Sequence, residues 1–284
     1  MVGQKRLLSD IEAQIESNNL PRFIILVGAR GSGRKLVAKE IANKLGATLA
    51  VSDNKISTIR EFIEQSYMLT SPMVYAIADA GNLTQASQNA LLKVTEEPPN
   101  KAYWIFTVEN TDQILPTLVS RGFTYTMDIY SQVELRGYLD SVTLYKEHKT
   151  DNATKSIILD IAETPGDIDL LLTQSVSEFK AYVDKVIDRI AVVSGSNSFK
   201  IGSKIAFKGE ADKYDLVLFW KAFMCECLSR IQSDVKKSDT NESTIKYADG
   251  IRITSKYLQD LQIASVSKSA TFDMWLLDIR ESWR

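Results

Sequence analysis

The feature that most constrains the fold of this chain is a pair of short apolar runs separated by one amphipathic segment. The runs Val74–Ile77 and Tyr103–Val108 have the length and composition of buried strands. Between them, Thr84 begins a segment with apolar residues at helical spacing, and a pair of prolines ends it. The apolar residues are Ala86, Ala90, Leu91 and Val94, and the prolines are Pro98 and Pro99. A buried strand that leads into a helix and a second strand favours an α/β fold.

A second strand-to-helix unit lies nearer the N-terminus and contains a glycine-rich turn. The apolar run Phe23–Val27 leads into Gly-Ala-Arg-Gly-Ser-Gly-Arg-Lys at residues 28–35, and an apolar helical pattern then extends to Leu45. Strand, glycine loop and helix in this order are the setting that a phosphate-binding P-loop requires. Glycines let successive backbone N–H groups turn toward a phosphate, and the helix N-terminus adds a favourable partial charge. The candidate phosphate-binding glycines are Gly28, Gly31 and Gly33.

The two positions after these glycines depart from a working P-loop. The working pattern is Gly-x-x-x-x-Gly-Lys-Ser/Thr, in which the lysine reaches the outer phosphates and the hydroxyl holds Mg²⁺. Gly28 and Gly33 have this spacing, but Arg34 stands at the lysine position and Lys35 at the hydroxyl position. A lysine repels Mg²⁺ and cannot coordinate it. The sequence therefore predicts a vestigial P-loop that has kept its shape and lost its metal chemistry, and it leaves open whether ATP or ADP still binds there.

Two further motifs carry a specific resemblance. The first is Asn-Ala-Leu-Leu-Lys-x-x-Glu-Glu-Pro-Pro at residues 89–99, and the second is Ile-Leu-Pro-Thr-x-x-Ser-Arg at residues 114–121. Together with the glycine loop and Val-Gly-Gln at residues 2–4, this ordered series resembles the AAA+ module of sliding-clamp loader subunits. It is most similar to the bacterial DNA polymerase III delta-prime subunit and its gamma/tau and replication factor C relatives. The resemblance covers about the first 130 residues.

The resemblance implies an architecture for the whole chain. We expect an α/β AAA+ core with a P-loop-type parallel sheet flanked by helices in residues 1–130. A small helical lid is expected in residues 131–175, and an all-α collar domain for oligomerisation in residues 176–284. Polar breaks at residues 194–200 and 233–243 are expected to separate helices of the collar. Stripes of apolar residues at helical spacing support these helices, and the longest comprises Phe179, Val183, Val186, Ile187 and Ile190.

The acidic motif that completes a P-loop site is not intact. In the resembled family, the strand that here begins at Val74 ends in Asp-Glu, whose aspartate binds Mg²⁺ and whose glutamate positions the attacking water. Counting back from Asn89 places Ala78 at the aspartate and Asp79 at the glutamate, whereas a shift by one places Asp79 and Ala80 there. One of the two acids is missing in either register.

The family pattern also implies roles for residues farther along the chain. In the sensor-2 pattern Gly-x-x-Arg, Gly166 matches the glycine, but Asp169 replaces the phosphate-contacting arginine. Asn110 lies near the position of a polar sensor residue, and it is equally suited to open a turn. The Ser120-Arg121 pair matches the motif whose arginine acts in trans on the ATP of the neighbouring subunit. The alternative for Arg121 is a surface ion pair.

Composition and charge limit the other possibilities. The chain is 44% apolar and 25% charged with a formal net charge of -2, and its first 130 residues hold as many basic as acidic residues, so a strong polyelectrolyte binder of nucleic acid is not expected. Cys225 and Cys227 are the only cysteines and His148 is the only histidine, so zinc is not expected. Cysteine scarcity and the absence of a long apolar run favour a cytoplasmic protein that is neither secreted nor membrane-spanning.

The preferred interpretation is an ATPase-dead clamp loader subunit, a delta-prime-like stator that needs no cofactor. Its expected partners are other AAA+ subunits in a hetero-oligomeric, pentameric ring, the sliding clamp, and primer-template DNA held by the assembled ring. Two alternatives stay open at this point. One is an active AAA+ ATPase in which Lys35 does the work of the P-loop lysine, and the other is a AAA-like adaptor or helicase loader outside the clamp loader.

Overall fold

The structure is a computed structural model that describes residues 3–145, 150–192, 214–236, 242–263 and 268–283. It contains two compact units, Met1–Glu134 with Thr164–Gly166 and Leu135–Glu163 with Asp167–Arg284. We call these the α/β unit and the helical unit. The division into core, lid and collar stays a prediction. Val2, His148 and the polar break at residues 194–200 lie outside the described residues, as does part of the break at 233–243.

The α/β unit is built on a five-stranded sheet in the order β2-β3-β4-β1-β5, and every neighbouring pair is parallel. Its strands are β1 (Phe23–Val27), β2 (Thr48–Val51), β3 (Met73–Ile77), β4 (Ala102–Val108) and β5 (Phe123–Thr126). The predicted α/β fold is confirmed. Because the strands are parallel, the loops that follow their carboxyl ends gather at one edge of the sheet.

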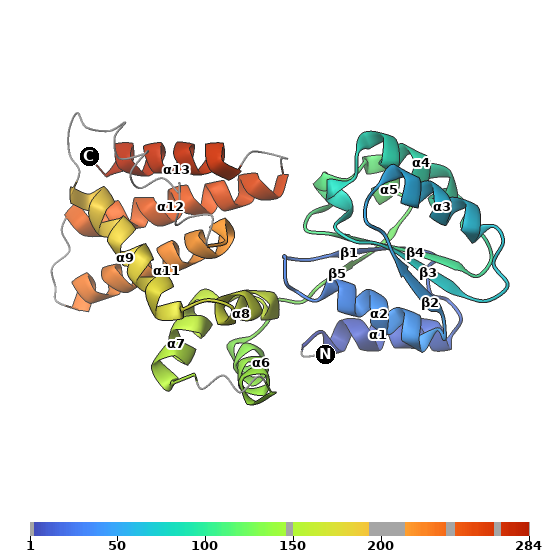
Figure 1. The fold of residues 1–284 in the computed structure, drawn as a ribbon, viewed down its shortest axis with the longest axis horizontal. Helices are drawn as coiled ribbons and strands as arrows, with labels where there is room; N and C mark the ends of the chain where they lie inside the picture. Colours follow the sequence, from blue (N-terminus) through green and yellow to red (C-terminus); the bar gives the residue numbers. More distant parts are fainter. Residues whose placement is uncertain (1–2, 146–149, 193–213, 237–241, 264–267, 284) are drawn as a thin grey trace. The chain divides into compact units, whose positions relative to one another are not determined.

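Helices cover both faces of this sheet (Figure 1). One face carries α1 (Lys5–Glu16) and α2 (Arg34–Lys44), and the other carries α3 (Ile56–Ser66), α4 (Gln85–Glu96) and α5 (Pro116–Val119). Short 3-10 helices, η1 (Ala80–Asn82) and η2 (Thr111–Gln113), follow β3 and β4. Alternate residues of β1 enter different cores, with Ile24 in the α1/α2 core and Ile25 in the other, as the pleat of a strand requires.

The structure corrects the predicted buried face of α4. Ala86 is exposed, whereas Ser87 and Gln88 are buried. Polar side chains can be buried there because they are hydrogen-bonded. Ser87 bonds the N-cap hydroxyl of Thr84, and the Gln88 amide donates to the Leu83 carbonyl and accepts from the Leu115 N–H. Gln88 thus ties the start of α4 to the start of α5.

The last strand of the sheet, β5, is shorter than its sequence pattern favours. The alternating pattern from Phe123 to Ile129 favours one strand, but β5 ends at Thr126, and Ile129 is 95% exposed. The side chain of Gln4 bonds both the N–H and the carbonyl of Asp128, each at 2.8 Å. These backbone groups are therefore satisfied by a side chain instead of by the sheet, and the strand ends before them.

The helical unit contains α7 (Asn152–Ile161), α9 (Val176–Val192), α11 (Leu216–Lys236), α12 (Glu242–Ile263) and α13 (Lys268–Ser282), together with most of α6 (Gln132–Tyr145) and α8 (Pro165–Leu172), whose first residues belong to the α/β unit. The predicted apolar stripe of α9 is buried. The core of the helical unit is strongly aromatic, with the Phe223 and Trp275 rings edge to face at 5.0 Å between centroids.

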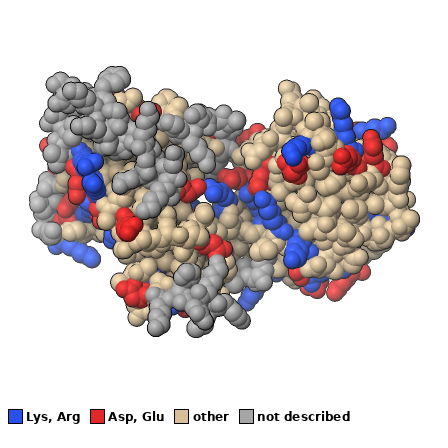
Figure 2. All heavy atoms as spheres, viewed as in Figure 1, with Lys and Arg blue, Asp and Glu red and all other residues tan. Residues whose placement is uncertain are grey.

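None of the described helices is both long and apolar enough to cross a membrane. On the face in Figure 2, basic and acidic side chains lie among one another.

The two cysteines lie on α11 as free thiols, and burial raises the pKa of Cys225 to about 11 and that of Cys227 to about 12. Because the thiolate is the reactive form, we expect iodoacetamide at pH 8 to label Cys225 at least about 100-fold and Cys227 at least about 1000-fold more slowly in the native chain than in the guanidinium-unfolded chain. Mass spectrometry of timed samples measures the rates. Equal rates in the two states would contradict the burial of α11.

Candidate functional site

The glycine loop connects β1 to α2 and has the backbone conformation that its glycines allow. Gly31 and Gly33 have φ of 81° and 90°, in the left-handed region that strains other residues. Gly33 is the N-cap of α2, so the loop ends at a helix N-terminus. Residues 28–35 thus run from β1 through left-handed glycines to the N-terminus of α2.

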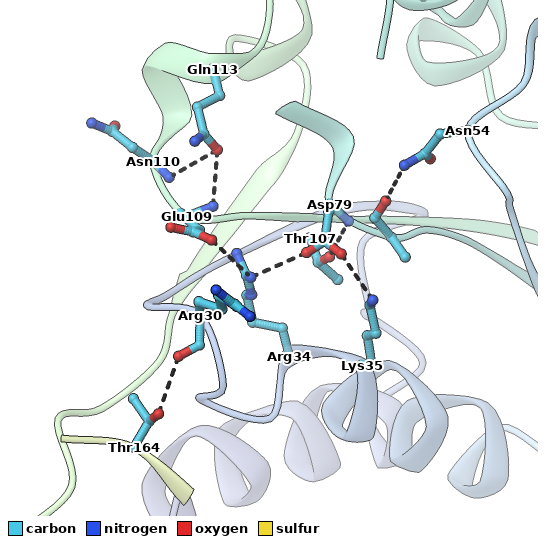
Figure 3. A network of polar contacts seen from close by, with 11 residues as sticks. Arg30, Arg34, Lys35, Asn54, Asp79, Thr107, Glu109, Asn110, Gln113 and Thr164 are labelled. Atoms are coloured by element: carbon cyan, nitrogen blue, oxygen red, sulfur yellow. Dashed lines mark hydrogen bonds and ion pairs between the residues drawn. The ribbon is translucent and has the colours of Figure 1, made fainter. Parts of the chain in front are cut away.

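The chain itself holds this loop from one side. Three successive carbonyls accept hydrogen bonds from downstream segments: the Arg30 carbonyl from the Thr164 hydroxyl at 3.2 Å, that of Gly31 from the Gly166 N–H at 3.1 Å, and that of Ser32 from the Tyr130 hydroxyl at 2.8 Å. The Thr164 contact is drawn in Figure 3. The backbones at Gly31 and Gly166 are so close that a Cβ at Gly166 would lie 2.4 Å from the Gly31 Cα. The loop conformation is thus fixed by contacts within the chain.

Arg34 and Lys35, the last two residues of the loop, both pair with Asp79 (Figure 3). Arg34 Nη2 lies 3.2 Å from Asp79 Oδ1, and Lys35 Nζ lies 2.9 Å from Asp79 Oδ2. The same Arg34 nitrogen lies 3.9 Å from the Glu109 carboxylate. Arg34 is buried, which lowers the pKa of its guanidinium against the opposing effect of Asp79 and Glu109. Both carboxylate oxygens of Asp79 therefore face positive charges of the chain's own loop.

The backbone around Asp79 is fixed as tightly as its side chain. Asp79 follows β3 by two residues in the left-handed region, with φ of 51°. Its N–H donates to the Thr107 hydroxyl of β4 at 2.8 Å, and the Asn54 amide donates to the Ala78 carbonyl at 2.7 Å. Ala78 and Ala80 are both buried. Of residues 78–80, only Asp79 has a carboxylate to offer the loop, whichever register of the acidic motif applies.

The residues at the two sensor positions, Asn110 and Asp169, have partners within the chain. The Asn110 side chain accepts a hydrogen bond from the Asp112 N–H at 3.1 Å and caps η2, so it opens the turn as one of the two interpretations expects. The residue before it, Glu109, is the one that faces Arg34. In the helical unit, Asp169 accepts a hydrogen bond from the Tyr138 hydroxyl at 2.9 Å.

Ser120 and Arg121 follow α5 and form a separate part of the α/β unit. Ser120 lies at the end of α5, and its hydroxyl donates to the Thr117 carbonyl at 3.2 Å. Arg121 Nη1 donates to the same carbonyl at 2.8 Å, and its Nη2 lies 3.0 Å from Glu96 Oε2 at the end of α4. A Cβ at Gly122 would lie 2.5 Å from Ile25 Cδ1, so a glycine lets the chain pass close over β1.

The structure thus brings residues 28–35 together with Asp79 and leaves Arg121 with Thr117 and Glu96 instead. The motifs of the sequence do not reveal Glu109, Thr107 or Glu96 as members of these sites. Glu109 had a usable signal, since it directly follows β4 at the carboxyl edge of the sheet, where binding residues gather. In the part of the chain that the structure describes, no three or more His, Cys, Asp or Glu residues are grouped to hold a metal ion.

Comparisons with known proteins find similarity to subunits of DNA polymerase III. The family model described as DNA polymerase III, delta subunit matches residues 46–130. The DNA polymerase III subunit gamma of Buchnera aphidicola subsp. Schizaphis graminum is 25% identical over 193 residues, which is 57% of this chain and 53% of that protein. The subunit gamma/tau of Mycoplasma pneumoniae is 29% identical over 150 residues, covering 42% of this chain and 22% of that protein. The chain spans about half the length of the Buchnera relatives that it matches.

Solved structures support the fold. The RuvB Holliday junction branch migration motor of Thermotoga maritima is similar with a TM-score of 0.54 and 16% identity, over 77% of this chain and 87% of that one. A point variant of the same motor is similar with a TM-score of 0.53 and 16% identity, over 75% and 85%. The chain therefore shares the fold of these solved motors. The family model and the curated relatives are all DNA polymerase III subunits, which confirms the resemblance as a similarity to that group of proteins.

Proposed function

We propose that this chain is a non-hydrolysing, delta-prime-like subunit of a clamp loader, which supplies Arg121 in trans to the ATP site of a neighbouring AAA+ subunit. It would act as the stator of the ring during loading of a sliding clamp onto primed DNA. The observation that carries the first half of this proposal is the pairing of both Asp79 oxygens with Arg34 and Lys35.

These residues do not fit the Mg²⁺ ion that a AAA+ ATPase uses. A working site offers a P-loop hydroxyl and an acidic oxygen to the metal. Here the hydroxyl position holds Lys35, and its ammonium lies 2.9 Å from the carboxylate of Asp79, the acidic residue of the motif. A divalent cation at Asp79 would have to displace two cations of the chain and remain close to both. Without the metal, the charge of a transferring phosphoryl group is not neutralised.

Asp169 adds independent support, because an anion stands where the family pattern has a phosphate-contacting arginine. Its carboxylate accepts the Tyr138 hydroxyl hydrogen bond instead. The second half of the proposal is that Arg121 acts as an arginine finger on a neighbouring subunit. It is supported by the Ser120-Arg121 motif and by the partial exposure of the Arg121 side chain, 29% of which is accessible. An arginine with a planar fork of donors suits recognition of a phosphate.

The remaining parts of the proposal concern partners and setting. We propose a pentameric hetero-oligomeric ring with other AAA+ subunits, contact with the sliding clamp, and contact with primer-template DNA through the assembled ring. We propose that this chain requires neither nucleotide nor Mg²⁺ nor zinc for its role, and that it acts in the cytoplasm. The DNA polymerase III names of its relatives support the proposed partners and the replication setting.

The test is ATP turnover with Mg²⁺, first by the isolated chain and then by the chain mixed with the AAA+ ATPase subunit encoded with it, with and without clamp and primed DNA. We expect the isolated chain to match the buffer background and the mixture to turn over ATP. The matched variant is Lys35→Ala, which we expect to leave turnover of the mixture unchanged, since Lys35 serves no catalytic step. Mg²⁺-dependent turnover by the isolated chain that Lys35→Ala abolishes would establish an active ATPase instead.

A further inference from the structure

We propose that Glu96 is the positioning residue for Arg121: its carboxylate holds the guanidinium at rest, and the phosphate of a neighbouring subunit has to displace it. The inference rests on the proposed trans role of Arg121. Glu96 lies outside the Ser120-Arg121 motif, 25 residues away from Arg121 in the sequence.

The position of Glu96 is unfavourable unless a cation is near. Glu96 is the last residue of α4, and Glu97 is its C-cap. Two carboxylates therefore lie at the negative end of the helix dipole, where acidic groups are destabilising. Lys93 lies in the same last turn, and Arg121 Nη2, at 3.0 Å from Glu96 Oε2, supplies the positive charge that contacts the Glu96 carboxylate.

The two contacts of Arg121 have different consequences. Nη1 donates to the Thr117 carbonyl at 2.8 Å, which keeps the guanidinium at the end of α5. Nη2 faces a carboxylate, which offers the same kind of anionic oxygen as a phosphate. The backbone contact therefore orients the arginine without competing for its charge, whereas Glu96 competes directly with a phosphate.

The pair is exposed enough to open. Accessible fractions are 29% for the Arg121 side chain and 58% for that of Glu96. Exposed ion pairs of this kind are weak and are screened by salt. Glu96 can thus hold the finger before assembly and yield to a triphosphate, which carries more negative charge than one carboxylate.

The test compares Glu96→Gln with Glu97→Gln in the mixture of the full chain and its partner ATPase. Both variants remove one negative charge from the same helix end, but only the first removes the partner of Arg121. At low salt we expect Glu96→Gln to raise kcat/KM for ATP by about two- to fivefold. We expect Glu97→Gln to leave it unchanged, and the gain to shrink at about 0.5 M salt because the Debye length shortens.

The Arg121→Ala background separates this inference from the proposed function. There we expect Glu96→Gln to have no effect, since a positioning residue acts only through the group it positions. Normal turnover by Arg121→Ala would overturn the proposed function. Loss of turnover by Arg121→Ala, combined with equal kcat/KM for Glu96→Gln and Glu97→Gln or a decrease for Glu96→Gln, would overturn only the role of Glu96.

Discussion

Replacing Arg121 with alanine is expected to lower ATP turnover at the adjacent subunit's site by about 10³ to 10⁵-fold in the assembled complex. That loss corresponds to about 4 to 7 kcal/mol of transition-state stabilisation. The effect is large because a guanidinium offers parallel donors to the charge that develops on the transferring phosphoryl group. Turnover of the mixture, measured with clamp and primed DNA at saturating ATP, gives the rate.

The fold of the variant is expected to remain. Arg121 contributes one partly exposed ion pair with Glu96 and a bond to the Thr117 carbonyl, and an exposed pair contributes about 0 to 1 kcal/mol. The thermal midpoint should therefore move by no more than a few degrees. A loss of turnover without a loss of stability assigns the effect to the finger.

Two variants make this result specific. Arg121→Lys keeps the charge but not the planar fork, so we expect a rate between those of wild type and Arg121→Ala. Arg60→Ala removes another exposed arginine of the same unit, on α3, and should leave turnover unchanged. Turnover by Arg121→Ala equal to that of Arg60→Ala would refute the finger and favour a plain surface ion pair with Glu96.

The sequence predicts the local parts of the loop site well. A strand, a glycine turn and a helix are neighbours along the chain, so the loop at residues 28–35 follows from apolar spacing and glycine conformation alone. The charge change at Arg34 and Lys35 is also visible in the sequence. What these two cations contact is not, because Asp79 and Glu109 approach them only once β3 and β4 lie beside β1 in the sheet.

Buried polar side chains account for the main differences between what the hydrophobic pattern predicts and what the structure shows. Hydropathy spacing predicts that Ala86 faces the core of α4, but Gln88 is buried instead, because it bonds two backbone groups that would otherwise be unsatisfied. The early end of β5 has the same origin, since Gln4 takes the backbone groups of Asp128. Both cases depend on residues that are distant in the sequence or on bonds that a hydrophobic pattern does not record.

Lys221 in the helical unit is another polar side chain whose burial the hydrophobic pattern does not record. Its replacement has the largest expected effect on stability. Lys221 lies in the apolar stretch of α11, with its Nζ 2.8 Å from Asp167 Oδ2 and 2.8 Å from the carboxylate of Glu163. Lys221 and Asp167 are both more than nine-tenths buried, whereas Glu163 is exposed. We expect Lys221→Met to destabilise this unit by about 3 to 5 kcal/mol, because the Asp167 charge stays buried without its cation.

The comparison with Lys246→Met tests whether burial is the cause. Lys246 pairs with Glu242 at 2.9 Å one turn away on α12, and the Glu242 side chain is 78% exposed, so its loss should cost about 0.5 kcal/mol or less. Hydrogen exchange of α11 amides follows the helical unit separately from the α/β unit. In the double variant Lys221→Met/Asp167→Leu, most of the stability should return. Equal protection of α11 in the two single variants would contradict the prediction.

The stability difference between wild type and Lys221→Met depends on pH through the pKa shift of Lys221. Burial by itself lowers the pKa of Lys221, but the charge and hydrogen bond of Asp167 and the contact with Glu163 outweigh it, so the folded-state pKa is raised. A raised pKa means that the folded state holds the proton more tightly than the unfolded state. The contribution of Lys221 is therefore fully present below the ordinary lysine pKa of about 10.4 and is lost as the pH rises through the raised folded value. We expect the stability gap between wild type and Lys221→Met to stay constant from about pH 6 to 9 and to narrow only above that range.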